Sequence, residues 1–118
     1  MGDATPDERG VRVAVDYEAV TELAKRYADD VRRVMPVDKA VLFGSYAKGT
    51  ADEGSDVDIC FFLKSYGGRE RVDVMSDMFL LTRGYNLAPF EPIAFETSDL
   101  EDDNPFVKEV LRTGREIL

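Results

Sequence analysis

Two aspartates at alternate positions, Asp56 and Asp58, are the residues whose type and spacing point most directly to chemistry. They stand at the start of a segment, 57–63, whose β-branched and aromatic residues predict a strand. Alternate residues of a strand point to one face, so the two carboxylates would lie side by side. Neighbouring carboxylates resist joint ionisation, and a divalent cation removes that conflict. Oxygen ligands without histidine or cysteine favour Mg²⁺, or Mn²⁺, over zinc.

A second feature, the pair Gly44 and Ser45, follows the short apolar segment 39–43, which predicts a buried strand. Glycine allows the backbone to approach a ligand closely, and amides at a helix start bind phosphate oxygens together with a serine hydroxyl. An ordinary turn explains Gly44 and Ser45 equally well, and two solvated acids would explain Asp56 and Asp58. Together, however, the two features supply the parts that metal-bridged triphosphate chemistry needs.

The elements that must position these residues follow from periodicity and from helix start and stop signals. Asp16 is a candidate N-cap for the first helix, and Asn104 with Pro105 for the last. The predicted elements are a helix over 17–34, strands over 39–43 and 57–63, a helix over 70–83, an extended segment over 87–95 and a helix over 105–113. This order predicts an α/β (α+β) domain over 16–118 with a small mixed sheet, preceded by a flexible segment over 1–15.

The amino-acid composition excludes several classes of function. The chain has 24 acidic and 15 basic residues, a net charge of −9, and its densest basic pair is Arg32-Arg33. Such a surface repels long nucleic acid, whereas a triphosphate brings metal cations with it. The absence of histidine and the single cysteine, Cys60, exclude Ser-His-Asp and Cys-His catalysis and an internal disulfide. With no long apolar run and no signal peptide, we expect a cytoplasmic protein without membrane contact.

The combined pattern resembles the DNA polymerase beta-like nucleotidyltransferase superfamily. The signature of that superfamily is an apolar residue, Gly, Gly or Ser, a spacer of roughly ten residues, and Asp-x-Asp/Glu between apolar positions. Here Phe43-Gly44-Ser45 is followed, after ten residues, by Asp56-Val57-Asp58-Ile59. The run Ser55-Asp56-Val57-Asp58 looks like the minimal, antitoxin-type nucleotidyltransferases, and the likeness covers most of the chain from Tyr17 on.

The resemblance implies a complete site. Asp56 and Asp58 would hold two Mg²⁺ ions. Glu91, in Phe90-Glu91-Pro92-Ile93, is the best match to the family's third carboxylate and is also a candidate base. Gly44 and Ser45 would hold phosphates with Lys48, where many relatives have arginine. Glu91 is also longer than the usual aspartate, which leaves efficient turnover open.

The same resemblance implies an activity and a partner. The chain would transfer an NMP from an NTP to a hydroxyl, with AMP from ATP as the expected case. The expected acceptor is a tyrosine of a helical HEPN-type protein. Two other hypotheses stay open. One is a catalytically weak or inactive nucleotidyltransferase-fold binding module or antitoxin, and the other is a small-molecule, antibiotic-type nucleotidyltransferase acting as a homo-oligomer.

Two expectations concern surfaces. One apolar side of the second long helix is predicted to consist of Val72, Met75, Phe79 and Thr82. For an exposed, partly apolar partner face the candidates are Phe90, Tyr85 and Tyr66, with core packing favoured for at least two of these three.

Overall fold

The computed structural model describes residues 15–85 and 89–118, so the predicted flexible segment lies outside the described residues except for Val15. No helix within these ranges is long and apolar enough to cross a membrane. In chain order the elements are α1 (Tyr17–Val34), β1 (Val37–Phe43), α2 (Ser45–Lys48), β2 (Val57–Leu63), α3 (Arg71–Leu81), the 3₁₀ helix η1 (Thr82–Tyr85), β3 (Phe90–Glu96), the 3₁₀ helix η2 (Thr97–Glu101), α4 (Pro105–Thr113) and β4 (Arg115–Glu116).

The sheet is mixed, as predicted, with the strand order β3-β2-β1-β4. Strand β1 runs antiparallel to β2 and to β4, whereas β3 runs parallel to β2. The short strand β4 was not predicted. Its two residues, which directly follow the glycine that ends α4, show no periodicity. They pair with Val41 and Leu42 only because the chain returns across the sheet.

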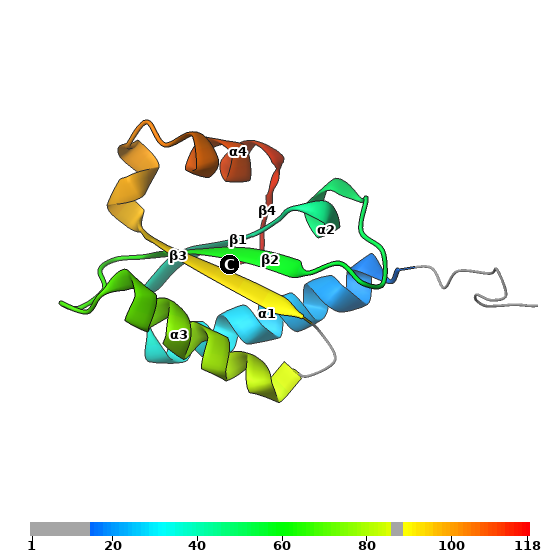
Figure 1. The fold of residues 1–118 in the computed structure, drawn as a ribbon, viewed down its shortest axis with the longest axis horizontal. Helices are drawn as coiled ribbons and strands as arrows, with labels where there is room; N and C mark the ends of the chain where they lie inside the picture. Colours follow the sequence, from blue (N-terminus) through cyan, green and yellow to red (C-terminus); the bar gives the residue numbers. More distant parts are fainter. Residues whose placement is uncertain (1–14, 86–88) are drawn as a thin grey trace, which may run out of the picture.

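Helices cover both faces of the sheet: α1 and α3 lie below it, and α4 lies above it (Figure 1). On the lower face the fully buried Tyr27 of α1 stacks on Phe90 with ring centroids 4.8 Å apart. Its hydroxyl donates a hydrogen bond of 2.7 Å to the carbonyl of Met78 in α3. A second apolar cluster, built around Val41, Phe62 and Val107, fills the space under α4. Strand β2 is therefore buried on both faces and holds a fixed position.

The predicted start of the first helix and both predicted ends of the last helix are confirmed. The Asp16 carboxylate accepts a hydrogen bond of 3.0 Å from the amide of Ala19, and Asn104 caps α4 with Pro105 in first position. Gly114 ends α4 as expected. The second long helix ends two residues earlier than predicted, because the chain tightens into η1 after Leu81.

The predicted apolar side of α3 is present, since Val72, Met75 and Phe79 line one groove, but it does not face the core. Val74 and Met78 face the core, whereas Val72 and Phe79 are exposed. Apolar residues occur all around this helix, so its sequence does not select one buried side. The helix turns instead to the side that fits beneath β2 and β3.

The three aromatic candidates for an exposed partner face are packed against the fold. Phe90 is buried, and Tyr85 packs against it while donating a hydrogen bond to the Asp30 carboxylate. Tyr66 is half-buried and donates to the carbonyl of Ala94 over 3.4 Å. The core packing favoured for at least two of them therefore holds for all three.

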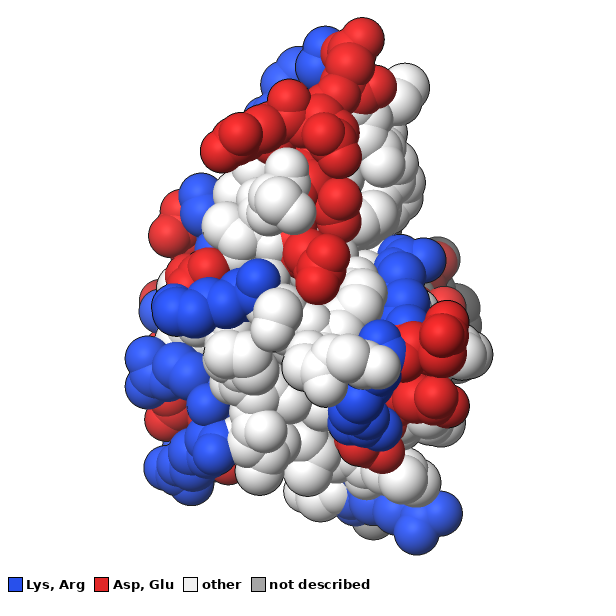
Figure 2. Space-filling view, turned by 90° about the vertical axis from the view of Figure 1, so that its left-hand side faces the viewer, with Lys and Arg blue, Asp and Glu red and all other residues white. Residues whose placement is uncertain are grey.

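Acidic side chains gather on the surface over η2, at the top of the face shown in Figure 2. Asp99, Glu101 and Asp102 belong to η2 and the residue that follows it. This cluster adds to the negative charge of the whole chain, which disfavours a polyanionic partner.

Candidate active site

The start of β2 carries the two aspartates. Val57 opens the strand, so Asp56 directly precedes it and is exposed, while Asp58 is its second residue and is half-buried. Burial raises the pKa of the Asp58 carboxyl above its ordinary value, and the negative charges of Asp56 and Glu91 raise it further. The charges of Asp56 and Glu91, two acids predicted to act with Asp58, are thus close enough to disturb the ionisation of Asp58.

Gly44 brings the backbone against the Asp58 carboxylate. Its φ of 73° and ψ of −151° lie where side chains are strained, and it is the residue before α2. A Cβ atom at this position would lie 2.3 Å from Oδ2 of Asp58. Strand pairing accounts for the proximity, because Phe43 at the end of β1 stands opposite Asp58. The glycine turn and the acid pair, 12 to 14 residues apart in sequence, therefore form one site.

Glu91 completes a row across the sheet. It pairs in register with Asp58 on the neighbouring parallel strand. Residues in register share a face, and the effect of Glu91 on the Asp58 pKa confirms their proximity. The side chain of Glu91 is exposed and makes no hydrogen bond or ion pair with another described residue.

Ser45 and Lys48 are the first and last residues of α2. The Ser45 hydroxyl forms no hydrogen bond within the described ranges, and the first amides of a helix have no intrahelical partner. Lys48 is exposed and lies near Glu109 of α4. The pKa of Glu109 is lowered mainly by a hydrogen bond from Arg112, and the charge of Lys48 lowers it further.

Sequence reasoning missed the residues that shape the loop before Asp56. The Tyr17 hydroxyl of α1 accepts a hydrogen bond of 3.1 Å from the amide of Ala51 and approaches that residue's carbonyl at 3.3 Å. Within the loop, the amide of Gly54 donates to the Asp52 carboxylate over 2.9 Å. This Asx turn has a sequence signal, an aspartate two residues before a glycine, but the contact with Tyr17 has none.

The described residues contain no group of three or more acidic or cysteine side chains gathered tightly enough to hold a metal ion. The predicted three-carboxylate ligand set therefore appears in the structure as a row of interacting acids and not as a closed cage. Mg²⁺ usually takes one or two protein carboxylates and completes its shell with water and substrate phosphates, so this arrangement fits its chemistry.

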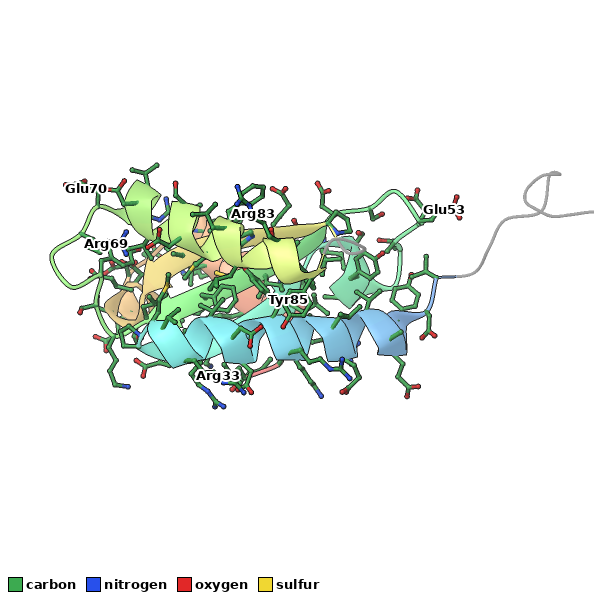
Figure 3. All side chains as sticks on the ribbon, turned by 90° about the horizontal axis from the view of Figure 1, so that it is seen from below. Arg33, Glu53, Arg69, Glu70, Arg83 and Tyr85 are labelled. Carbon is green, nitrogen blue, oxygen red and sulfur yellow. The ribbon has the colours of Figure 1, made fainter. Side chains whose placement is uncertain are left out.

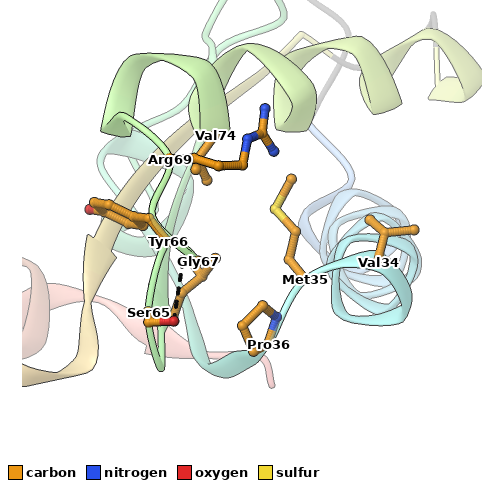
Figure 4. A pocket seen from close by; sticks show the side chains of 9 residues that line it. Val34, Met35, Pro36, Ser65, Tyr66, Gly67, Arg69 and Val74 are labelled. Carbon is orange, nitrogen blue, oxygen red and sulfur yellow. Dashed lines mark hydrogen bonds between the residues drawn. The ribbon is translucent and has the colours of Figure 1, made fainter.

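A small pocket of about 160 Å³ lies at the opposite end of β2, beside Leu63 (Figure 4). Its lining is mostly apolar, and the guanidinium of Arg69 in that lining pairs with Asp77 at 2.8 Å. The pocket shares no residue with the row of acids and is not part of the candidate site.

The raised pKa of Asp58 predicts how stability depends on pH. The folded chain binds this proton more tightly than the unfolded chain, so the contribution of Asp58 to the free energy of unfolding is greatest at low pH. It falls as pH rises from the ordinary value of 3.8 through the raised folded value. Urea unfolding of the wild type and Asp58→Asn, compared between about pH 3 and about pH 7, should show a difference that declines over this window. A difference that is independent of pH would contradict it.

The family comparison agrees with this geometry. The sequence model of the family described as "Nucleotidyltransferase domain" matches residues 24–113, a range that contains every predicted site residue. A protein of Methanocaldococcus jannaschii described as a "Putative protein adenylyltransferase" is 33% identical over 95% of this chain and 74% of its own length. A second protein of that organism with the same description is 38% identical over 38% of this chain and 48% of its own.

Solved structures share the fold. A "putative nucleotidyltransferase" from Sulfolobus solfataricus superposes with a TM-score of 0.60 at 23% identity, over 72% of this chain and 74% of its own. A structure described as a toxin-antitoxin with AMP-PNP superposes with a TM-score of 0.55 at 17% identity, over 80% of this chain and 72% of its own. At these sequence identities the likeness shows a shared fold and nothing more specific.

Proposed function

This chain belongs to the nucleotidyltransferase domain family, and from that membership we propose that it transfers AMP from ATP to a hydroxyl group of a partner protein. The observation that carries the proposal is the Asp58 carboxylate, which lies against the Gly44 turn and is crowded by Asp56 and Glu91. Acids held this close to a glycine-serine turn, a type of turn that can bind phosphate, suit a metal-bound triphosphate. Such a ligand carries positive charge and phosphate groups together.

Mg²⁺ is the proposed cofactor, held by Asp56 and Asp58, with Glu91 as a third ligand for the ion near the acceptor. The donors are all carboxylate oxygens, the type that Mg²⁺ prefers, and Mn²⁺ could replace it. When bound, the two ions would neutralise charge on the triphosphate and polarise the phosphorus that is attacked.

The residues of the chain then have separate tasks in the reaction. The Ser45 hydroxyl and the backbone amides at Gly44 and Ser45 would hold the β- and γ-phosphates, with Lys48 as a mobile positive charge. The acceptor hydroxyl attacks the α-phosphorus in line with the bridging oxygen. Its O–P bond forms as the bond to the β-phosphate breaks, the hydroxyl proton passes to Glu91, and pyrophosphate leaves.

The choice of ATP and of a protein acceptor is supported by the relatives. Both relatives are described as a "Putative protein adenylyltransferase", and one structure with this fold is described as a toxin-antitoxin with AMP-PNP. By resemblance to minimal nucleotidyltransferases, the proposed partner is a helical HEPN-type protein that offers a tyrosine hydroxyl.

Labelled ATP tests the proposal. The chain is incubated with the purified product of the adjacent gene, Mg²⁺, and ATP labelled at either the α- or the γ-phosphate. We expect α-label on the acceptor protein, no γ-label, and loss of transfer when EDTA removes the metal. Label from the γ-phosphate would show a kinase reaction instead, and absence of both labels would contradict nucleotidyl transfer to this acceptor.

A non-catalytic binding module is the second candidate. It is favoured by the position of Lys48, whose charge lies near the acidic Glu109 of α4. A tight complex with the same partner that takes up no label would support this alternative.

A further inference from the structure

Helix α3 exposes an apolar surface beside the candidate site, and none of its apolar residues has a role in the proposed reaction, although Glu91 lines the same groove. The side chains of Val72, Phe79 and Leu80 are 67%, 56% and 50% exposed, which places them among the most exposed large apolar residues that the structure describes. With the small Ser76 between them they form the surface that we call the α3 face. Adjacent exposed apolar residues of this size mark an interaction surface more often than a chance feature.

The α3 face has the shape of a ridge between two grooves. Leu80 lines both of them. A groove of about 470 Å³ separates α3 from Glu91 and Pro92 of β3. The other, of about 310 Å³, lies between α3 and the end of α1, where Val34 is 65% exposed. A second helix with the same ridge would fit into these grooves, since helices pack ridge into groove.

A strand is the less suitable occupant. Strand β3 is at the edge of the sheet, so an added strand would have to pair with it. Pro92, in the middle of β3, has no N–H to donate and weakens any such pairing. The surface therefore favours packing by a helix over extension of the sheet.

Charges near the start of α3 and in η1, directly after it, indicate that the partner helix is α3 of a second copy. Asp73 lies seven residues before Leu80, and Arg83 lies four residues after Phe79, spacings that place both on the exposed side. Both side chains are exposed, and neither forms an ion pair with another described residue. Figure 3 shows the acidic residue Glu70 at the start of α3 and Arg83 toward its other end. Two such helices packed antiparallel would bring Asp73 of each copy opposite Arg83 of the other.

We propose that the α3 face binds a second copy of this chain, in a two-fold symmetric dimer with antiparallel α3 helices. A two-fold interface must be complementary to itself, and this surface offers a ridge, a groove and opposite charges five residues to either side of position 78. A stable interface buries about 800 Å² on each partner, and the groove lined by Leu80 and Val34 extends the available surface from α3 toward α1. The dimer does not depend on nucleotidyl transfer.

Sedimentation velocity measures the dimer directly. The wild type should sediment as twice the 13.2 kDa chain mass. Leu80→Glu places an unpaired charge in the interface twice, which should weaken dimerisation at least about 100-fold. Leu111→Glu, at a comparably exposed leucine of α4, is the matched control and should leave the dimer unchanged. A monomeric wild type, or a Leu80→Glu variant that still dimerises, would overturn the proposal.

A charge exchange tests the antiparallel arrangement without touching the apolar residues. Arg83→Glu sets like charges opposite each other at two symmetric places and should weaken dimerisation about tenfold. Adding Asp73→Arg to the same chain restores opposite charges and should return affinity to within about threefold of the wild type. Because Asp73 in α3 and Arg83 in η1 are ten residues apart along consecutive helical segments, about 15 Å, they cannot compensate within a single chain. Failure of the double exchange to restore the dimer would exclude this arrangement.

Discussion

Nucleotidyl transfer is expected to fall by at least about 10²- to 10³-fold when Asp56→Asn and Asp58→Asn are combined, while the fold is retained. Asparagine keeps the shape of each side chain but removes the negative charge that would attract a metal-bound triphosphate. The fold should not suffer, because burial and neighbouring acids already disfavour the ionised form of Asp58. The measurements are the rate of α-labelled AMP transfer and the midpoint of urea unfolding.

A matched control separates the site from the overall charge. Glu101→Gln with Asp102→Asn removes two exposed acids from η2 and its following residue, so both double variants have the same net charge. The control should transfer AMP at the wild-type rate. Retained transfer by the Asp56/Asp58 variant would remove these residues from the mechanism, and a collapsed unfolding midpoint would show that the pair is structural.

Short stretches of sequence predicted those parts of the fold that depend on interactions between residues close together in the chain. The caps at Asp16 and Asn104 each need only a side-chain oxygen and nearby amides of the same helix. The extent of β2 follows from a run of apolar residues that is buried on both faces. The proximity of Gly44 to Asp58 could be anticipated through the motif that joins them, although their contact itself depends on the register of β1 with β2.

Features set by long-range packing could not be predicted in the same way. The orientation of α3 depends on which of its apolar residues fit under the sheet. Val74 and Met78 are the ones buried in the core there. Tyr17 reaches Ala51 across 34 residues, so no short window of sequence contains that contact. The two residues of β4 become a strand only because β1 is beside them. Each of these depends on the assembled tertiary structure.

Gly44→Ala is expected to reduce AMP transfer more than any other single change at the turn. The backbone of Gly44, with φ 73° and ψ −151°, lies in a region essentially restricted to glycine, which costs alanine about 1–3 kcal/mol of stability. The added methyl group would also lie 2.3 Å from Oδ2 of Asp58. Because the clashing atom is the end of a side chain, the Asp58 carboxylate would move away before the strand does. We therefore expect a folded but destabilised protein whose transfer rate falls by about 10²-fold.

Gly49→Ala provides a comparison that separates the clash with Asp58 from the cost of backbone strain. Gly49 also has a positive φ, of 76°, but a methyl group there would meet no atom within 4 Å. Left-handed backbone should cost this variant about 1–2 kcal/mol, while transfer stays near the wild-type rate. Urea unfolding and labelled-ATP assays of the two variants separate backbone strain from displacement of Asp58. Equal loss of transfer in both variants would show that strain alone is responsible, and wild-type transfer by Gly44→Ala would show that the reaction does not need Asp58 held against this turn.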